Sequence, residues 1–267
     1  MEKSFAKRTK PVNEYYPNLR FRDIIRMLFG AAVAVVVAIV LAPPMLLITL
    51  VSPSWRVGQF FGYVWSWSVA AAMGITASLS GAENVKIGDS YIVTPNHQSY
   101  IDVLALELVL PVKVLWVIKK ELARIPFFGW ALSRSGAICI NRSNSEEAVK
   151  SLREGSSKLV DGWSLLIYPE GTRSPTTSLQ PFKKGPFMLA VQTGISILPV
   201  TINGAYRIWP KYSIAFRPGH MTVTIGKPIS TEGLSEEDVL ELIDKTRRAI
   251  LDHLDEDYSP FRDKMKS

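Results

Sequence analysis

The residues of this chain best suited to move a proton are a histidine and an aspartate five positions apart. His97 and Asp102 lie between the apolar, strand-like residues 91–93 and a helix-prone run at 103–108. In one continuous helix this spacing would set the two side chains about 140° apart. They can meet only if His97 lies in a turn before the helix and folds back over its first turn. A carboxylate on one imidazole nitrogen would then fix the tautomer and leave the other nitrogen free to take a proton from a hydroxyl group.

The sequence around this pair allows such a turn. Pro95 disfavours helix at Thr94, and Asn96 is predicted to cap the helix that starts after it. A simpler interpretation makes His97 a capping or hydrogen-bonding residue and Asp102 a solvated acid in the first helical turn. The spacing alone leaves both interpretations open.

A second segment with reactive side chains follows the apolar residues 165–167. Because a strand again runs into a turn, we expect this segment to share the edge of a sheet with His97. Gly171 would let the backbone approach a ligand closely, and the planar guanidinium of Arg173 suits phosphate oxygens. Glu170 would orient Arg173 or hydrogen-bond a substrate hydroxyl. The alternative is a plain salt bridge between Glu170 and Arg173 on a surface loop.

Two further turns extend this edge. Arg142 follows the apolar strand predicted at 136–140 and is a second candidate phosphate ligand, although an arginine beyond a strand is more often merely solvated. Residues 197–200 form an apolar strand that Pro199 interrupts, and its expected role is that of a core strand with an edge proline.

The elements that position these turns follow from the pattern after residue 83, where short apolar runs alternate with helical segments. Strands are predicted at 84–87, 90–93, 113–118, 136–140, 164–168, 196–202 and 221–226, and helices at 101–109, 127–134, 144–160, 184–193 and 235–254. This alternation predicts an α/β fold with a central mixed β-sheet flanked by helices.

The N-terminal region differs in character from the rest. Residues 1–26 are basic, whereas 27–55 and 57–82 contain no charged side chain. Each uncharged stretch exceeds the roughly 20 residues that cross a bilayer as a helix, but Pro43-Pro44 is predicted to interrupt the first. The alternatives are a transmembrane hairpin, a helical pair that dips into one leaflet, and a buried hairpin in a soluble core. The prolines and an aromatic cluster favour the second, and the basic N-terminus would place both ends in the cytoplasm.

Three segments are therefore predicted: a basic segment at 1–26, a membrane-associated helical hairpin at 27–82 and an α/β domain at 83–267. The formal charge of +7 indicates an anionic partner, either nucleic acid, a membrane surface or a phosphorylated substrate. The 47% of hydrophobic residues favours the membrane, so we predict no nucleic-acid partner. The single cysteine, Cys139, excludes an intramolecular disulfide, and no metal site is predicted.

Taken in order, the four turns resemble the glycerolipid acyltransferase family, and within it the 1-acyl-sn-glycerol-3-phosphate acyltransferases. The matching blocks are Asn-His-x4-Asp at 96–102, Gly…Arg at 136–142, Pro-Glu-Gly-Thr-Arg-Ser at 169–174, apolar-Pro at 198–200 and a basic-glycine step at Lys184-Gly185. The resemblance covers roughly residues 80–230. Any one block alone would be a weak signal, but the first and third together, with a membrane segment ahead of them, are specific.

The resemblance implies a reaction. His97, oriented by Asp102, would deprotonate the sn-2 hydroxyl of lysophosphatidic acid, and that oxygen would attack the thioester of acyl-coenzyme A or acyl-carrier protein. The products would be phosphatidic acid and a free thiol, with no covalent acyl-enzyme and no cofactor besides the acyl donor. The residues implied to bind the acceptor are Glu170, Gly171, Thr172, Arg173, Arg142 and Lys184. The implied location is the cell (inner) membrane, with the catalytic domain on its cytoplasmic face.

Other functions stay open at this stage. Within the same class, the acceptor could be glycerol 3-phosphate or another lysophospholipid. A hydrolase, either a thioesterase or a phospholipase, would use His97 on water, and a lipid-binding membrane protein would use neither acid nor base. Residues 125–130, flanked by Arg124 and Arg134, are either a second membrane-docking patch or the ordinary packing of a helix start.

Overall fold

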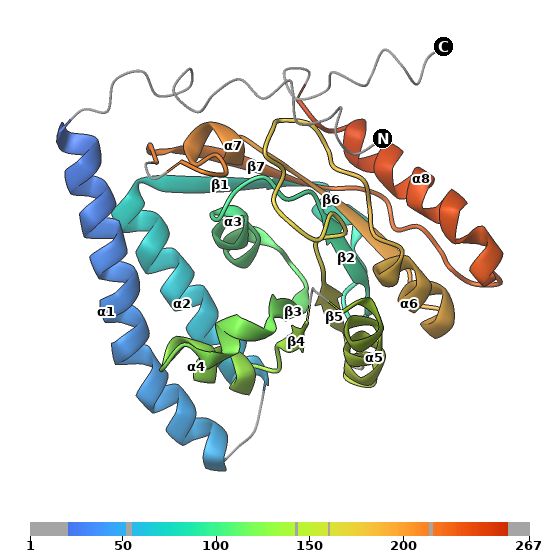
Figure 1. The fold of residues 1–267 in the computed structure, drawn as a ribbon, viewed down its shortest axis with the longest axis horizontal. Coiled ribbons are helices and arrows are strands. Elements are labelled where there is room, and N and C mark those ends of the chain that lie inside the picture. Colours follow the sequence, from blue (N-terminus) through green and yellow to red (C-terminus); the bar gives the residue numbers. More distant parts are fainter. Residues whose placement is uncertain (1–20, 52–54, 142–143, 160, 214–215, 256–267) are drawn as a thin grey trace.

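The structure of the protein is a computed structural model that describes residues 21–51, 55–141, 144–159, 161–213 and 216–255. A single twisted sheet runs through the centre, with a long helical hairpin along one side and the remaining helices on its two faces (Figure 1). The predicted basic segment lies largely outside the described residues, which begin at Phe21.

The sheet has seven strands. In spatial order they are β1 (Ile75–Ser80), β7 (Gly219–Ile225), β6 (Ile197–Asn203), β2 (Ile92–Pro95), β5 (Trp163–Leu166), β3 (Lys113–Lys119) and β4 (Ile138–Ile140). The last five run parallel to one another, while β7 pairs antiparallel with β6 and parallel with β1. The predicted mixed sheet is therefore confirmed. Since β2 and β5 are parallel neighbours, the turns that follow them meet at one edge.

Helices cover both faces of this sheet. They are α3 (Asp102–Val109), α4 (Phe128–Arg134), α5 (Ser145–Ser156), α6 (Gly185–Thr193), α7 (Ala205–Ile208) and α8 (Val239–Leu251), with short 3-10 helices η3 (Ala82–Asn84), η4 (Lys120–Arg124) and η5 (Glu236–Asp238). Successive side chains of β2 point to opposite faces. Ile92 packs into the core beneath α6 and α8, whereas Val93 packs into the core shared with α2 and α3. The strand that leads to His97 is therefore packed between two apolar layers, one on each face of the sheet.

The N-terminal hairpin consists of α1 (Phe21–Val51) and α2 (Trp55–Met73), which pack along each other. The predicted break at Pro43-Pro44 is wrong, because α1 runs through both prolines as one helix about 46 Å long. The flanking residues Ala42 and Met45 are buried, so packing on both sides of the prolines compensates for the missing backbone donors. Of the described helices, α1 alone is long and apolar enough to cross a membrane.

The second helix of the hairpin is shorter than predicted. It ends at Met73, and Gly74 then adopts a left-handed conformation with φ 67°. Residues 75–80 are not membrane helix but the edge strand β1, in which apolar and small polar side chains alternate as they do in a half-buried strand. The strand predicted at 84–87 is wrong as well, because η3 and a turn occupy this stretch. The absence of charged residues in 57–82 does not show where α2 ends and β1 begins.

Candidate active site

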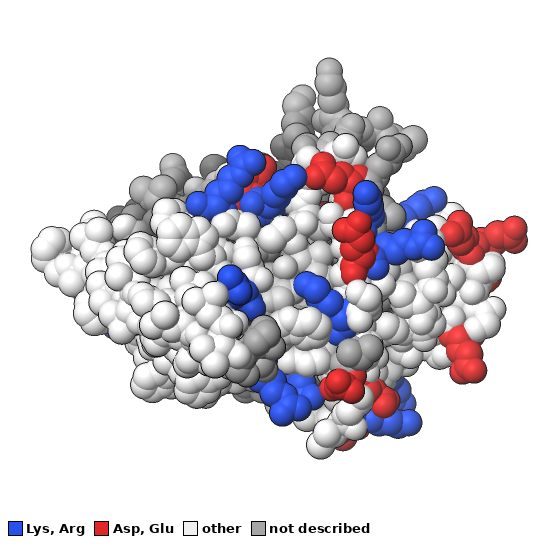
Figure 2. Space-filling view, turned by 90° about the horizontal axis from the view of Figure 1, so that it is seen from below, with Lys and Arg blue, Asp and Glu red and all other residues white. Residues whose placement is uncertain are grey.

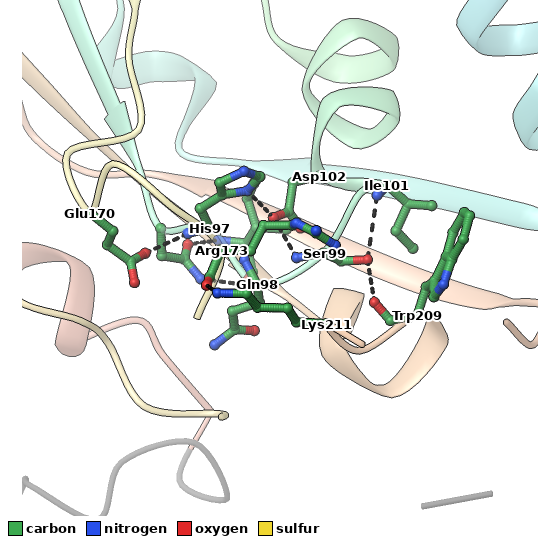
Figure 3. A network of polar contacts seen from close by, with 11 residues as sticks. His97, Gln98, Ser99, Ile101, Asp102, Glu170, Arg173, Trp209 and Lys211 are labelled. Carbon is green, nitrogen blue, oxygen red and sulfur yellow. Dashed lines mark hydrogen bonds and ion pairs between the residues drawn. The ribbon is translucent and has the colours of Figure 1, made fainter. Parts of the chain in front are cut away.

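The turn between β2 and α3 brings His97 and Asp102 together. The imidazole Nδ1 lies 2.8 Å from Asp102 Oδ2, and the same oxygen accepts hydrogen bonds from the backbone amides of Gln98 (2.8 Å) and Ser99 (2.9 Å) (Figure 3). The Asp102 side chain is 1% exposed and that of His97 is 12% exposed. The carboxylate therefore orients the ring and also closes the turn that carries it.

This contact assigns the proton on the imidazole. A nitrogen that faces a carboxylate carries the hydrogen, so Nδ1 is the donor to Asp102 and Nε2 keeps its lone pair. Asp102 stabilises the imidazolium that forms when Nε2 takes a second proton. The alternative that Asp102 is a solvated first-turn acid is wrong, because this residue is buried.

Asn96 does not cap the helix, contrary to the prediction. The helix begins at Asp102, and the Asn96 amide reaches across to β6 instead. Its Nδ2 donates to the carbonyl oxygen of Ile202 at 3.0 Å, and its Oδ1 accepts from the Ile202 amide at 2.7 Å. The asparagine thus ties the turn after β2 to its neighbour β6, a long-range pairing that the local sequence does not indicate.

The turn after β5 packs directly on His97. The ring of Tyr168 stacks on the imidazole, with centroids 3.7 Å apart and planes 16° apart. The amide of Ser174 donates to the His97 carbonyl oxygen at 2.7 Å. Tyr168 was not a sequence candidate, because its contact with His97 depends on β2 and β5 being neighbours. An aromatic residue at the end of a strand is the only local signal.

Glu170 supports the backbone of this site. Its side chain is buried, Oε1 accepts from the His97 amide at 2.6 Å, and Oε2 accepts from the Gln180 amide at 2.9 Å. Burial raises the pKa of Glu170 to about 8, and these two hydrogen bonds oppose that rise. The predicted pairing with Arg173 is wrong, because among the described residues no ion pair joins the two. The carboxylate joins two backbone segments instead.

The guanidinium of Arg173 lies over an aromatic ring beside this turn. Its Cζ is 3.3 Å from the ring centroid of Tyr100, a cation–π contact. Its Nη1 is buried and has no hydrogen-bond partner within the described part of the chain. A buried guanidinium donor without a partner is a group that an anionic oxygen would satisfy.

A lysine that the sequence did not suggest lies next to Arg173. Lys211 Nζ donates to the Arg173 carbonyl oxygen at 2.6 Å and lies 3.4 Å from Thr172 Oγ1 (Figure 3). Thr172 is exposed. The loop at 171–173 and Lys211 from a second loop therefore bring a hydroxyl group and two cationic residues together.

The other predicted binding residues are placed as follows. Gly171 has a φ of 71°, a conformation that side-chain-bearing residues rarely adopt, and the side chain of Lys183 lies against it. Lys184 precedes α6 and is exposed, and no side-chain contact to the His97 turn is described for it. Arg142 follows β4 but lies outside the described residues.

An apolar cavity of ≈ 200 Å³ lies on the other side of α3. It is enclosed by α1, α2, α3, β3 and α4, and its wall includes Val103, the residue after Asp102. Glu107 also lines it and accepts a hydrogen bond from Trp116 Nε1 at 3.0 Å. Burial raises the pKa of Glu107 to about 7. One short helix thus carries Asp102 at the polar site and Glu107 in an apolar cavity.

Comparisons with known proteins agree with this architecture. The family model described as acyltransferase matches residues 77–203, from β1 to the end of β6. A 1-acyl-sn-glycerol-3-phosphate acyltransferase of Saccharomyces cerevisiae is 39% identical over 193 residues, which cover 70% of this chain and 63% of that protein. The Cocos nucifera protein of the same name is 32% identical, over 77% of this chain and 66% of that protein. The chain thus spans slightly less than two thirds of the length of these relatives.

A solved structure shares the fold. The crystal structure of the 1-acyl-sn-glycerophosphate (LPA) acyltransferase PlsC from Thermotoga maritima superimposes with a TM-score of 0.74 and 24% sequence identity. The match covers 86% of this chain and 95% of that one. The structural match therefore covers more of the chain than residues 77–203, which the family model matches.

Proposed function

The chain belongs to the glycerolipid acyltransferase family, and from this premise we propose that it transfers an acyl chain from a thioester to the sn-2 hydroxyl of lysophosphatidic acid, forming phosphatidic acid. The observation that carries the proposal is the 2.8 Å contact between His97 and Asp102. In the neighbouring turn, which follows β5, the Nη1 donor of Arg173 is buried and has no hydrogen-bond partner among the described residues. A base and an anion-binding group at one sheet edge suit an acceptor with a hydroxyl and a phosphate.

The reaction needs one base and no protein nucleophile. His97 Nε2 takes the proton of the acceptor hydroxyl while its oxygen forms the new C–O bond at the thioester carbonyl. The C–S bond then breaks, and the imidazolium returns the proton to the leaving thiolate. Ser99 is a poor alternative nucleophile, because it is buried and its Oγ donates to the Trp209 carbonyl oxygen at 2.6 Å. Acyl-coenzyme A or acyl-carrier protein serves as the donor, and no further cofactor is required.

The phosphate of the acceptor binds at the loop 171–173. Arg173 offers its Nη1 donor, and Lys211 adds a second positive charge beside the Arg173 backbone. The loop reaches this position through the left-handed backbone at Gly171, which a residue with a side chain rarely adopts. Arg142 and Lys184 stay as predicted contributors to this site. This positive charge favours a phosphorylated acceptor over a neutral one.

The α1–α2 hairpin anchors the enzyme in one leaflet of the cell (inner) membrane, with the α/β domain on the cytoplasmic face. Three contacts support a leaflet position, because they attach α2 to the domain along its length. Gly58 packs on Ser135, Gly62 lies against Glu107, and Trp65 packs on Phe128. A helix flanked by a polar domain along its length cannot cross a bilayer by itself. A site beside the leaflet spares lipid chains a transfer into water that costs roughly 0.8 kcal/mol per CH₂.

The test is an assay of the purified full chain in phospholipid vesicles. Lysophosphatidic acid, glycerol 3-phosphate and other lysophospholipids are each offered with acyl-coenzyme A and with acyl-carrier protein thioesters, and both thiol release and lipid product are followed. We expect thiol release to depend on lysophosphatidic acid and to match phosphatidic acid in amount. Thiol release that continues undiminished without an acceptor would identify a hydrolase. Turnover with glycerol 3-phosphate alone would move the protein to another acceptor class.

A further inference from the structure

The segment that connects β3 to β4 exposes four large apolar side chains. Three of them, Ile125, Phe127 and Trp130, are 43%, 38% and 49% exposed, and we call these three residues the α4 patch. The rings of Phe127 and Trp130 lie 5.5 Å apart, so the patch is one surface and not scattered residues. Leu122, 40% exposed, lies on the preceding η4.

The outward direction of these side chains is fixed by the inward ones between them. Phe128 packs on Trp65 of α2, with ring centroids 5.5 Å apart. Gly129 is buried so tightly that a side chain there would collide with the backbone of Leu122 and Ala123. The core-packing interpretation of this segment therefore applies to Phe128 and Gly129 only. The side chains of the α4 patch point to the surface and do not pack into the core.

Exposed basic residues border the patch. Arg124 precedes it on η4, and Arg134 ends α4. Lys119 and Lys120 lie nearby and are neutralised in part by Glu121 and Glu147, at 3.4 Å and 3.1 Å. The two arginines thus leave a net positive rim around an aromatic surface, the combination that binds an anionic membrane interface.

The helix that carries Trp130 packs against the hairpin. Side chains of α1 and of α4 line the same cavity, among them Leu41 and Met45 on one side and Leu132 on the other. Figure 2 shows a broad uncharged surface at the end of the molecule formed by the hairpin, with lysine and arginine side chains where this surface gives way to the domain. The segment that bears the α4 patch is therefore held directly against the hairpin.

We propose that the α4 patch is a second membrane contact, which inserts into the interface of an anionic leaflet while Arg124 and Arg134 bind lipid phosphates. This inference rests on the proposed leaflet position of the hairpin and adds a separate line of attachment. A hairpin alone leaves the domain free to rotate about the helix axes. A second contact fixes the height of His97 above the lipid surface and lets the cavity between α1 and α4 face the acyl chains.

The single cysteine of the chain allows a direct test. Cys139 is replaced by alanine, one cysteine is placed at position 130, 36 or 240, and each is labelled with an environment-sensitive fluorophore. The labelled full chains are bound to vesicles of phosphatidylglycerol and phosphatidylcholine that carry a lipid-bound quencher. Val36 reports on the exposed side of α1, and Leu240, 62% exposed on α8, is the matched control on the domain.

We expect the probe at position 130 to be quenched like the probe at 36, and the probe at 240 to stay unquenched. Quenching at 36 but not at 130 would overturn the α4 contact and leave the hairpin anchor intact. No quenching at 36 would instead contradict the leaflet position itself, whatever the result at 130.

A second measurement separates insertion from charge. Arg124→Gln should raise the apparent KM for lysophosphatidic acid about fivefold in vesicles rich in phosphatidylglycerol, the loss expected for one basic residue at an anionic surface. The effect should vanish in detergent micelles without anionic lipid, and Lys245→Gln on α8 should change neither value. An equal loss in micelles would assign Arg124 to the reaction and not to the membrane.

Discussion

The two ends of α3 border regions that are stabilised by different forces. At its N-terminus, Asp102 Oδ2 accepts three hydrogen bonds within 2.9 Å, and Glu170 braces the same turn through two backbone amides. The next residue, Val103, and Glu107, more than one turn further on, line a cavity whose wall is almost entirely apolar. The first region is specified by a few directional contacts and the second by many weak ones.

This difference predicts how each region responds to substitution. Hydrogen bonds in a buried site are short-range and directional, so the loss of one partner disables the group that it orients. Dispersion contacts in a cavity are small individually, so a single change alters affinity or stability gradually. Substitutions near His97 should therefore change the rate, whereas those near Glu107 should change stability and leave the chemistry in place.

The largest effect is expected for His97→Ala. Removal of the general base should lower kcat by about 10²–10⁴-fold, because His97 Nε2 is the group that takes the hydroxyl proton in the proposed step. Vesicle association should be unchanged, since His97 has no part in the hairpin. His253→Ala, at an exposed position after α8, is the matched control and should keep full activity. Full activity of His97→Ala would remove the base assignment.

The second-largest effect is expected for Arg173→Ala, which should weaken binding of the acceptor. The loss of a charge-assisted hydrogen bond to phosphate should raise KM for lysophosphatidic acid about 10–100-fold, with a smaller change in kcat. Lys211→Ala should raise KM for lysophosphatidic acid less, because the Lys211 ammonium already donates one hydrogen bond to the Arg173 carbonyl oxygen. Arg207→Ala serves as control, since that exposed side chain pairs with Asp255. Unchanged saturation in Arg173→Ala would rule out the phosphate role.

A smaller change is expected from the ring that stacks on His97. Tyr168→Leu removes the stacked face and should lower kcat about 2–10-fold at an unchanged acceptor KM, because the imidazole loses one of its two positional constraints. Tyr168→Phe keeps the ring and should retain most of the activity. If the leucine variant turns over as fast as the phenylalanine variant, the stacking has no part in positioning the base.

The smallest effect on turnover is expected at Glu107, where stability should change instead. Its pKa is raised from 4.5 to about 7, so between these values the folded chain binds a proton that the unfolded chain releases, and stability falls as the pH rises. Glu107→Gln stays neutral, keeps the shape and should be more stable than the parent at pH 8, by on the order of 1–3 kcal/mol. The two should be equal below about pH 4.5.

Thermal unfolding of both proteins in one detergent, at pH 4.5 and pH 8, measures this difference. Glu170, whose pKa is raised to about 8, contributes a dependence of the same sign to both proteins and cancels in the comparison. A stability difference that does not change with pH would show that the pKa of Glu107 is the same in the folded and the unfolded chain.

Much of the site could be predicted because its signals are local. A strand, a turn and a helix start in direct succession put His97 and Asp102 within one loop, and the spacing required that the loop fold back. The turn containing Glu170 and Arg173 was placed at the same edge because it also follows a strand. The partners of these residues were not predictable: Tyr168 meets His97 only since β5 lies beside β2, and Lys211 reaches Arg173 from a loop 38 residues away.

The α/β class, the apolar N-terminal hairpin and the residue types at the sheet edge can be read from local patterns, because periodicity and turn chemistry act over a few residues. Three features depend on long-range packing: α1 continues through Pro43 and Pro44, residues 75–80 join the sheet, and Glu170 bonds two backbone segments and does not pair with Arg173. These outcomes depend on which surfaces meet after the chain has folded. Burial and long-range pairing then outweigh local preference, because packing on both sides of a residue contributes more free energy than its intrinsic propensity.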